Sequence, residues 1–263
     1  MIDNPRSPRV RAVAKLAKRS ARAETGLFLA EGPQAVAEAF AFRPETVVEF
    51  YATRAALDRY GALAQAAVDA GVVIDSISDH VLAAMSDTVT PQGVIAVCRQ
   101  LPVTVESLLD GAPKLIAILE EVRDPGNAGT IIRAADAAGA DGVILTGRSV
   151  DAYNPKVVRS TTGSIFHLPI AQAIELDAAV ALVKAAGIQV LAADIKGDDL
   201  PDIRAALTQP TAWLFGNEAH GLSDESLALA DRAVKVPIYG HAESMNLATA
   251  ASVCLYESAF AQN

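Results

Sequence analysis

The sequence is poor in aromatic residues and cysteine, and it contains no long apolar run. Phenylalanine, tyrosine and tryptophan make up 5% of the 263 residues, so aliphatic side chains are expected to fill most of the core. No stretch of about 18 or more apolar residues occurs, which argues against a transmembrane helix and a membrane partner. The basic N-terminus is not followed by an apolar segment, so no signal peptide is expected. Cys98 and Cys254 lie far apart in the sequence, which favours reduced thiols in a cytoplasmic protein.

Several common fingerprints of active sites are also missing. No G-x-G-x-x-G follows a predicted strand, no G-x-x-x-x-G-K-[ST] forms a phosphate-binding loop, and no G-x-S-x-G forms a nucleophile elbow. The histidines make no metal-binding pattern, so no metal is expected; they are His80, His167, His220 and His241. An ordinary doubly wound enzyme acting on a small metabolite is therefore disfavoured.

Charge is distributed unevenly along the chain. The formal net charge is −9, which argues against broad, non-specific binding of nucleic acid. Residues 1–23 nevertheless carry +6, which leaves −15 for the remainder; the basic residues are Arg6, Arg9, Arg11, Lys15, Lys18, Arg19 and Arg22, and the acid is Asp3. Apolar residues at helical spacing predict an amphipathic basic helix over 7–22. Residues 1–23, here called the basic arm, are typical of a segment that contacts RNA, although a solvated helix face explains the same pattern.

Strand and helix signals alternate along the whole chain, which predicts an α/β fold with two domains. In residues 1–100 we expect strands at 27–31, 47–52, 72–74 and 94–97, with helices between them. Residues 101–113 contain Pro102, Gly111 and Pro113 and are interpreted as a linker. Residues 114–263 then predict strands at 115–120, 142–145, 165–168, 189–193, 212–215 and 233–238. Their continuous apolar character is typical of a buried parallel sheet with helices on both faces.

Polar residues gather where three of these strands end. The strand at 115–120 is followed by a helix whose first turn contains Asp124 and Asn127, with Arg133 about two turns further on. A helix N-terminus favours an anion, and an arginine side chain offers a planar fork for phosphate. Alternatively, Asn127 is a plain helix cap and Arg133 a surface ion pair.

The second and third polar groups follow the predicted strands at 212–215 and 233–238. The first of these strands runs into Gly216 and Glu218, and the second into a loop with Ser244 and Asn246 that opens a helix over 246–261. Ligands of open α/β sheets bind at the carboxyl ends of the strands. These groups are therefore expected to share one site.

Together the three stretches resemble the motifs of the SpoU (TrmH-type) RNA ribose 2′-O-methyltransferases of the SPOUT superfamily. They read N-x-G-x-x-x-R-x-A over 127–135, F-G-N-E-x-x-G-L-S over 215–223 and V-P-I-x-G-x-x-E-S-x-N-L over 236–247. The resemblance spans about 114–260. Residues 1–100, with F-L-A-E-G at 28–32 and S-D-T-V-T-P-Q-G at 86–93, resemble the L30e/L7Ae-like substrate-binding domain that often accompanies this family.

The resemblance implies a parallel sheet that ends in a deep trefoil knot, an exception to the rule that chains are not knotted. The knot would bind S-adenosylmethionine, and family members are typically homodimers formed through this domain. The implied cofactor-binding positions are Gly216, Ile238, Leu247, Ser244, Ala192 and Ala193. Arg133 would reach the cofactor of the partner subunit.

The implied reaction is attack of a ribose 2′-oxygen on the sulfonium methyl group, with catalytic positions at Arg133, Asn127, Glu218, Ser244 and Asn246. Because a guanidinium has a pKa above about 12, we favour Arg133 gripping a phosphate and stabilising alkoxide charge, with Asn127 orienting the hydroxyl. Glu218 is either a proton acceptor or an orienting partner. The L30e-like domain favours ribosomal RNA over tRNA as substrate; a tRNA methyltransferase and a non-catalytic RNA-binding protein remain alternatives.

Overall fold

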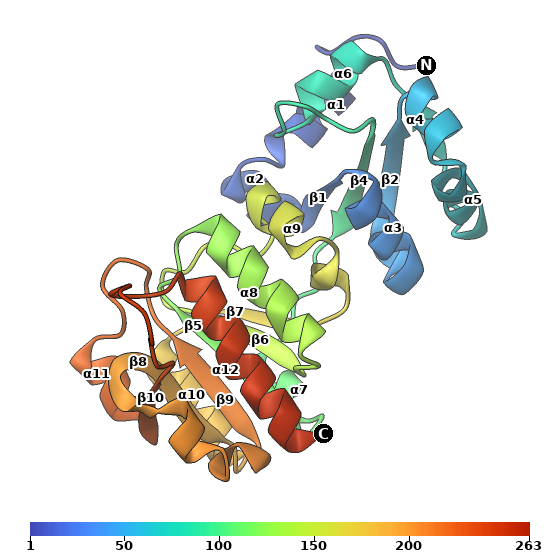
Figure 1. The fold of residues 1–263 in the computed structure, drawn as a ribbon. Coiled ribbons are helices and arrows are strands. Elements are labelled where there is room, and N and C mark those ends of the chain that lie inside the picture. The colour runs from blue at the N-terminus through green and yellow to red at the C-terminus, as the bar shows by residue number, and fades with distance from the viewer. The chain divides into compact units, whose positions relative to one another are not determined.

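The chain folds into two compact units (Figure 1). The structure is a computed structural model that describes residues 1–263. The first unit comprises Met1–Leu101 together with Tyr153–His167, and the second comprises Pro102–Ala152 and Leu168–Asn263. No helix combines the length and the apolar character that a membrane crossing requires.

The first unit is a mixed four-stranded sheet covered by short helices. The sheet order is β1-β4-β2-β3, in which β4 runs antiparallel to β1 and β2, and β3 runs parallel to β2. The strands are β1 (Leu27–Glu31), β2 (Val47–Ala52), β3 (Ile74–Ser76) and β4 (Val94–Arg99). The helices are α1 (Pro8–Lys15), α2 (Arg19–Thr25), α3 (Pro33–Phe42), α4 (Arg54–Arg59), α5 (Gly61–Asp69), α6 (Asp79–Met85) and α9 (Pro155–Thr161), with 3-10 turns η1 (Pro44–Thr46) and η2 (Ser164–Phe166).

The single basic helix predicted over 7–22 is wrong, because the chain turns between α1 and α2. The backbone N–H of Leu16 donates to the carbonyl of Val13 at 3.0 Å, which tightens the end of α1. Arg22, 2% exposed, folds back and donates from Nη1 to the carbonyl oxygens of Leu16 (2.8 Å) and Ala17 (2.9 Å). A buried guanidinium needs such acceptors, so this side chain fixes the turn.

The second unit is a parallel six-stranded sheet in the order β10-β8-β9-β5-β6-β7, which confirms the predicted α/β architecture. Its strands are β5 (Leu115–Glu120), β6 (Gly142–Thr146), β7 (Ile170–Ile174), β8 (Gln189–Asp199), β9 (Thr211–Phe215) and β10 (Arg232–Lys235). Its helices are α7 (Val105–Leu109), α8 (Pro125–Ala137), α10 (Leu176–Ala185), α11 (Asp224–Leu229) and α12 (Leu247–Gln262), with 3-10 turns η3 (Leu200–Ile203) and η4 (Ala206–Thr208).

Helices cover both faces of this sheet, as the apolar strands predict. On one face α7 and α10 pack against alternate residues of β5 and β9, including Ile116, Ile118 and Leu214. On the other face α8 and α12 lie side by side (Figure 1). Trp213, fully buried, donates from Nε1 to the hydroxyl of Ser258 on α12 at 2.8 Å. This bond ties the last helix to the centre of the sheet.

Three predicted strands of the second unit have clearly different limits in the structure, and in the first unit the strand predicted over 72–74 is observed as β3 at Ile74–Ser76. No strand forms over 165–168: Ser164–Phe166 form the 3-10 turn η2 and β7 begins at Ile170, because Thr162 and Gly163 adopt left-handed backbone angles (φ +51° and +108°) that end α9 and turn the chain. The strand predicted to end at 193 continues to Asp199. The strand predicted over 233–238 ends at Lys235, since Pro237 has no backbone N–H to continue the ladder.

Candidate active site

The N-terminus of α8 is the centre of the candidate site. Asp124 caps this helix, since its Oδ1 accepts from the backbone N–H of Asn127 at 2.7 Å, and Pro125 occupies the first helical position. Glu218 arrives from the segment after β9 and occupies the same end: Oε1 accepts from the N–H of Asp124 at 3.2 Å and Oε2 from the N–H of Arg123 at 3.4 Å. A carboxylate here satisfies free N–H groups and complements the positive end of the helix dipole.

A chain of side-chain hydrogen bonds joins all three sequence motifs at this point. Asn127 donates from Nδ2 to Oε1 of Glu218 at 3.4 Å, and Asn246 donates from Nδ2 to Oδ1 of Asn127 at 3.0 Å. Asn246 also caps α12, because its Oδ1 accepts from the N–H of Thr249 at 3.2 Å. Residues far apart in sequence are thus held by the first turns of two neighbouring helices.

The segment after β9 is held by a tight reversal that sequence reasoning did not single out. Asn217 and Gly221 exchange backbone hydrogen bonds of 3.2 and 2.9 Å, and Asn217 donates from Nδ2 to the carbonyl of Glu121 at 2.8 Å. A Cβ on Gly216 would lie 2.6 Å from the carbonyl carbon of Gly221. Glycine at 216 is therefore required by this close backbone approach.

Glu121 is a second residue that the sequence reasoning missed. It adopts a left-handed conformation (φ +54°) directly after β5, and it forms ion pairs with Arg123 and with Arg148, the latter at 3.2 Å. The hydrogen bond from Arg123, followed by one from the backbone N–H of Arg148, lowers the pKa of Glu121 to about 2. This carboxylate is therefore ionised at neutral pH and holds two cations beside the N-terminus of α8.

Arg133 and Ser244, the other two predicted catalytic residues, stand apart from the hydrogen-bond chain. Arg133 is exposed on α8 and has no hydrogen bond or ion pair within the chain. It lies six residues beyond Asn127, about 9 Å along the helix axis. Ser244 is exposed in the loop between β10 and α12. The structure thus brings Asn127, Glu218 and Asn246 together, and it leaves Arg133 and Ser244 free for a ligand or another chain.

The predicted cofactor-binding residues occupy the carboxyl edge of β8, β9 and β10. Gly216 is buried at the end of β9, Ala192 is buried in β8 and Ala193 follows it half-buried. Leu247 begins α12 and is half-buried, while Ile238 is 37% exposed in the loop after β10. Because adjacent parallel strands end at the same edge, these residues border one region.

An irregularity in the pairing of β8 with β10 shapes this edge. Ala233 pairs with Ala192, but the next residue, Val234, pairs with Asp198, so residues 193–197 leave the regular ladder. At Gly197 a Cβ would lie 2.3 Å from the carbonyl carbon of Ala233. Ile195 is 72% exposed in this excursion. This excursion therefore leaves backbone groups without regular strand pairing beside an exposed apolar side chain.

Other candidate chemistries receive no support from the structure. Both cysteines are free and fully buried, and burial raises the pKa of each thiol to about 12, so neither is a thiolate nucleophile at neutral pH. No cluster of three or more His, Cys, Asp or Glu side chains could hold a metal ion. His220 and His241 are exposed.

Comparisons with known proteins identify the family of each part of the chain. Residues 114–256 match the SpoU rRNA Methylase family, and residues 7–96 match the MRM3-like substrate binding domain. The 23S rRNA (guanosine(2553)-2′-O)-methyltransferase RlmP of Bacillus subtilis is 34% identical over 258 residues, 97% of each chain.

Solved structures of similar proteins cover nearly the whole chain. An AdoMet-bound rRNA methyltransferase from Sinorhizobium meliloti has a TM-score of 0.82 and 31% identity, covering 98% of this chain and 96% of its own. The AdoMet complex of the SpoU methyltransferase AviRb from Streptomyces viridochromogenes has a TM-score of 0.81 and 29% identity, covering 97% and 98%. The family match includes the N-terminus of α8, the segment after β9 and the first turns of α12, so the chain belongs to the SpoU rRNA methylase family.

Proposed function

We propose that this protein transfers a methyl group from S-adenosylmethionine to a ribose 2′-hydroxyl of ribosomal RNA. The observation that carries the proposal is the hydrogen-bond chain through Glu218, Asn127 and Asn246. It assembles three separate family motifs at the carboxyl edge of the parallel sheet. The name of the RlmP relative, a 23S rRNA 2′-O-methyltransferase, supports ribosomal RNA rather than tRNA.

The cofactor would lie against the loops that follow β8, β9 and β10. Gly216, Leu247 and the backbone at Ala192 and Ala193 would border its adenosine, and the exposed side chain of Ile238 would cover the ring. When bound, S-adenosylmethionine supplies the electrophilic methyl group. Residues 236–246 separate β10 from α12; we propose that this segment and α12 form the deep knot implied by the family resemblance.

Glu218 would act as a positioning residue rather than as the proton acceptor. Both of its oxygens already accept hydrogen bonds from backbone N–H groups at the start of α8, and Oε1 also accepts from Asn127. This arrangement fixes the amide of Asn127, which in turn accepts from Asn246. The two amides would then orient the ribose, as a rigid set of groups must for an in-line displacement.

Arg133 would bind a phosphate next to the target ribose and stabilise the developing alkoxide charge. Its guanidinium is exposed and has no partner within the chain, so it is available to an anion. Arg133 lies about 9 Å along α8 from Asn127. This separation is compatible with Arg133 contacting the site of a second subunit. We therefore propose a homodimer formed through the second unit, in which each Arg133 serves the partner.

The first unit would supply much of the binding to RNA. Arg11, Lys15, Lys18 and Arg19 are exposed on α1, on α2 and between them, and such a cluster neutralises phosphates. The rest of the chain is acidic, so this cluster would set the orientation of the RNA.

The deciding experiment is mass mapping of ribose methylation in ribosomal RNA and tRNA from cells with and without the gene. Loss of one 2′-O-methyl group from ribosomal RNA, restored by the wild-type gene but not by Arg133→Ala, is expected. Loss of a tRNA methyl group would instead assign the tRNA alternative. Unchanged methylation of both RNAs, together with no transfer of labelled methyl groups in vitro, would favour a non-catalytic RNA-binding protein.

A further inference from the structure

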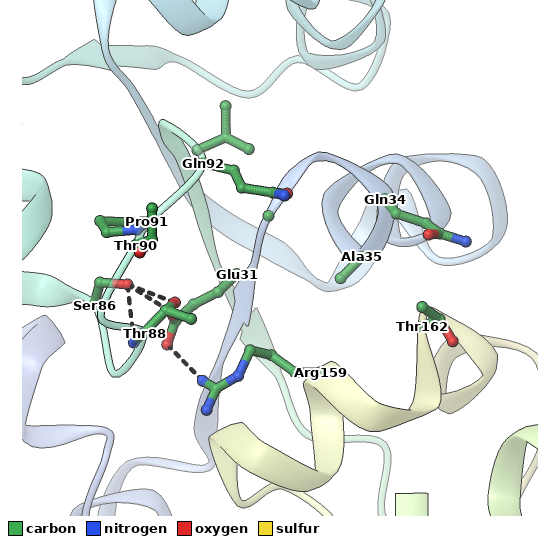
Figure 2. A pocket seen from close by; sticks show the side chains of 12 residues that line it. Glu31, Gln34, Ala35, Ser86, Thr88, Thr90, Pro91, Gln92, Arg159 and Thr162 are labelled. Atoms are coloured by element: carbon green, nitrogen blue, oxygen red, sulfur yellow. Dashed lines mark hydrogen bonds and ion pairs between the residues drawn. The ribbon is translucent and has the colours of Figure 1, made fainter. Parts of the chain in front are cut away.

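A cavity of about 310 Å³ lies within the first unit (Figure 2). It is bordered by the start of α3, by the loop between α6 and β4, and by the C-terminal end of α9. This volume is at the small end of the range for ligand pockets, about 300–1,000 Å³. It suits one small planar group and excludes a nucleic-acid helix.

The rim of the cavity carries neutral hydrogen-bonding groups without partners in the protein. Gln34 and Gln92 are exposed on two different segments, and neither side-chain amide makes a hydrogen bond within the chain. Thr90 adds a third exposed polar side chain. The buried hydroxyl of Thr162, on the α9 side, also lacks a partner. Ala35 and Val94 supply an apolar floor beneath these groups.

The charged groups at the cavity largely neutralise one another. Arg159 lies 3.6 Å from Oε1 of Glu31 through Nη1 and 3.0 Å from Oδ2 of Asp87 through Nη2. Glu31 is buried and accepts from the hydroxyls of Ser86 (2.5 Å) and Thr88 (2.7 Å), as Figure 2 shows. Two carboxylates face one guanidinium, so the cavity offers no surplus positive charge and disfavours a phosphate group.

We propose that this cavity binds one unstacked nucleobase of the RNA substrate. A base is planar and apolar on its faces, and its edges carry neutral donors and acceptors that side-chain amides match. Proteins that recognise an RNA sequence mostly bind bases that are unstacked from a loop or bulge. The inference rests on the proposed function and deepens it: Gln34 and Gln92 would read the base, while the exposed cations of α1 and α2 contact phosphate.

Binding of single nucleotides tests the chemical class of the ligand. The four ribonucleoside 5′-monophosphates, ribose 5-phosphate and inorganic phosphate would each be titrated into the full-length protein, with backbone amide resonances as the readout. At least one monophosphate is expected to shift Gly32 and Gly93 saturably and to bind more tightly than ribose 5-phosphate. If ribose 5-phosphate or inorganic phosphate binds as tightly as the monophosphates, the cavity is an anion site and the proposal is overturned. The absence of a saturable shift with every nucleotide would also overturn it.

Substitution of the two glutamines tests the residues. Gln34→Leu and Gln92→Leu remove the amides at exposed positions, and each is expected to weaken nucleotide binding roughly two- to tenfold. The control is Gln65→Leu on α5, an exposed glutamine of the same unit that does not line the cavity and whose amide donates to Oδ1 of Asp69 at 2.8 Å. Thermal melting verifies that each variant is folded. Wild-type affinity in the Gln34→Leu, Gln92→Leu double variant would refute the assignment.

The same variants separate this proposal from the proposed function. With ribosomal RNA as substrate, the double variant is expected to raise KM and to leave cofactor binding unchanged. If the wild-type protein methylates ribosomal RNA and the double variant has the same KM, the base-binding proposal fails and the function stands. If the wild-type protein transfers no methyl group to RNA, the function fails, and the nucleotide titrations still decide what the cavity binds.

Discussion

Replacement of Glu218 by glutamine distinguishes a positioning carboxylate from a catalytic base. Glutamine keeps the length of the side chain and one carbonyl oxygen, so it can still accept from the start of α8. It loses the negative charge and replaces the second acceptor with a donor, which faces the N–H of Arg123 or Asp124. The change therefore weakens the cap and abolishes any capacity to take a proton.

The two roles predict effects of different size. If Glu218 only orients Asn127, loss of its charge at the helix N-terminus costs about 0.3–1 kcal/mol, and the rate of methyl transfer falls less than about tenfold. A general base contributes roughly 100- to 10,000-fold. Because both carboxylate oxygens are already occupied as acceptors, we expect the smaller effect for Glu218→Gln. A larger effect is expected for Glu218→Ala, which leaves Asn127 without this partner.

Single-turnover methyl transfer, measured with saturating cofactor from pH 6 to 9, gives the required comparison. Wild type and Glu218→Gln are expected to show the same pH profile, offset by a constant factor. Asn127→Asp serves as a second variant, because it keeps the shape of the side chain but removes the donor to Glu218. A loss of 100-fold or more in Glu218→Gln, with the ascending limb of the profile removed, would refute the positioning role and identify Glu218 as the proton acceptor.

Three further perturbations test the arm, the core and the acidic residue beside α8. Replacing Arg11, Lys15, Lys18 and Arg19 by glutamine should reduce the magnitude of the slope of log RNA affinity against log salt concentration by up to roughly 3, measured by filter binding. The control replaces Arg54 and Arg59 on α4. An equal reduction of the slope in the control would contradict specific contact of the first four cations with RNA. Ser258→Ala leaves the buried Nε1 of Trp213 unpaired and should cost about 1–3 kcal/mol, seen in thermal melts, whereas Ser252→Ala on the same helix, whose hydroxyl only donates to the carbonyl of Ala248, should have little effect. The pKa of Glu121 is lowered from 4.5 to about 2, so its stabilising contribution is present above pH 4.5 and is lost as the pH falls towards 2. The free energies of unfolding of wild type and Glu121→Gln, measured in urea between pH 5 and 2, should therefore converge at the acid end. A constant difference between the two free energies over this range would contradict the prediction.

The parallel sheet could be predicted from the sequence because its signal is local and strong. The strands β5, β6 and β9 are almost entirely buried and read as continuous apolar runs, including Leu115–Glu120 and Thr211–Phe215. Both faces of a buried parallel strand are covered, so its sequence is a continuous apolar run between polar segments. The turn at 164–166 shows the limit of that signal. Ile165 and Phe166 are equally apolar and buried, yet they form a 3-10 turn after a left-handed residue.

The cluster of Asn127, Glu218 and Asn246 was predictable in part, for a physical reason. Asn127, Glu218 and Asn246 follow strand ends or begin helices, and topology alone brings such positions to one edge of the sheet. Asn217 was missed because its role depends on a hydrogen bond from its side chain to the carbonyl of Glu121, 96 residues away in the sequence. Glu121 was missed because its ion pair with Arg148 joins segments that follow two different strands. Neither hydrophobic periodicity nor local conformational propensity predicts a contact between residues so far apart in the sequence.

The basic arm shows why composition alone does not separate structural cations from those available to RNA. Arg9 pairs with Glu49 at 3.0 Å and with Asp75, and the buried guanidinium of Arg22 accepts no ligand because it holds the turn after α1. Val10, Val13 and Leu16 pack in the core of the first unit. Deletion of residues 1–23 would therefore unfold part of that core, and weaker RNA binding after such a deletion would not identify a phosphate contact. Only substitution of the exposed cations, with the buried ones left intact, separates attraction of RNA from stability of the unit that binds it.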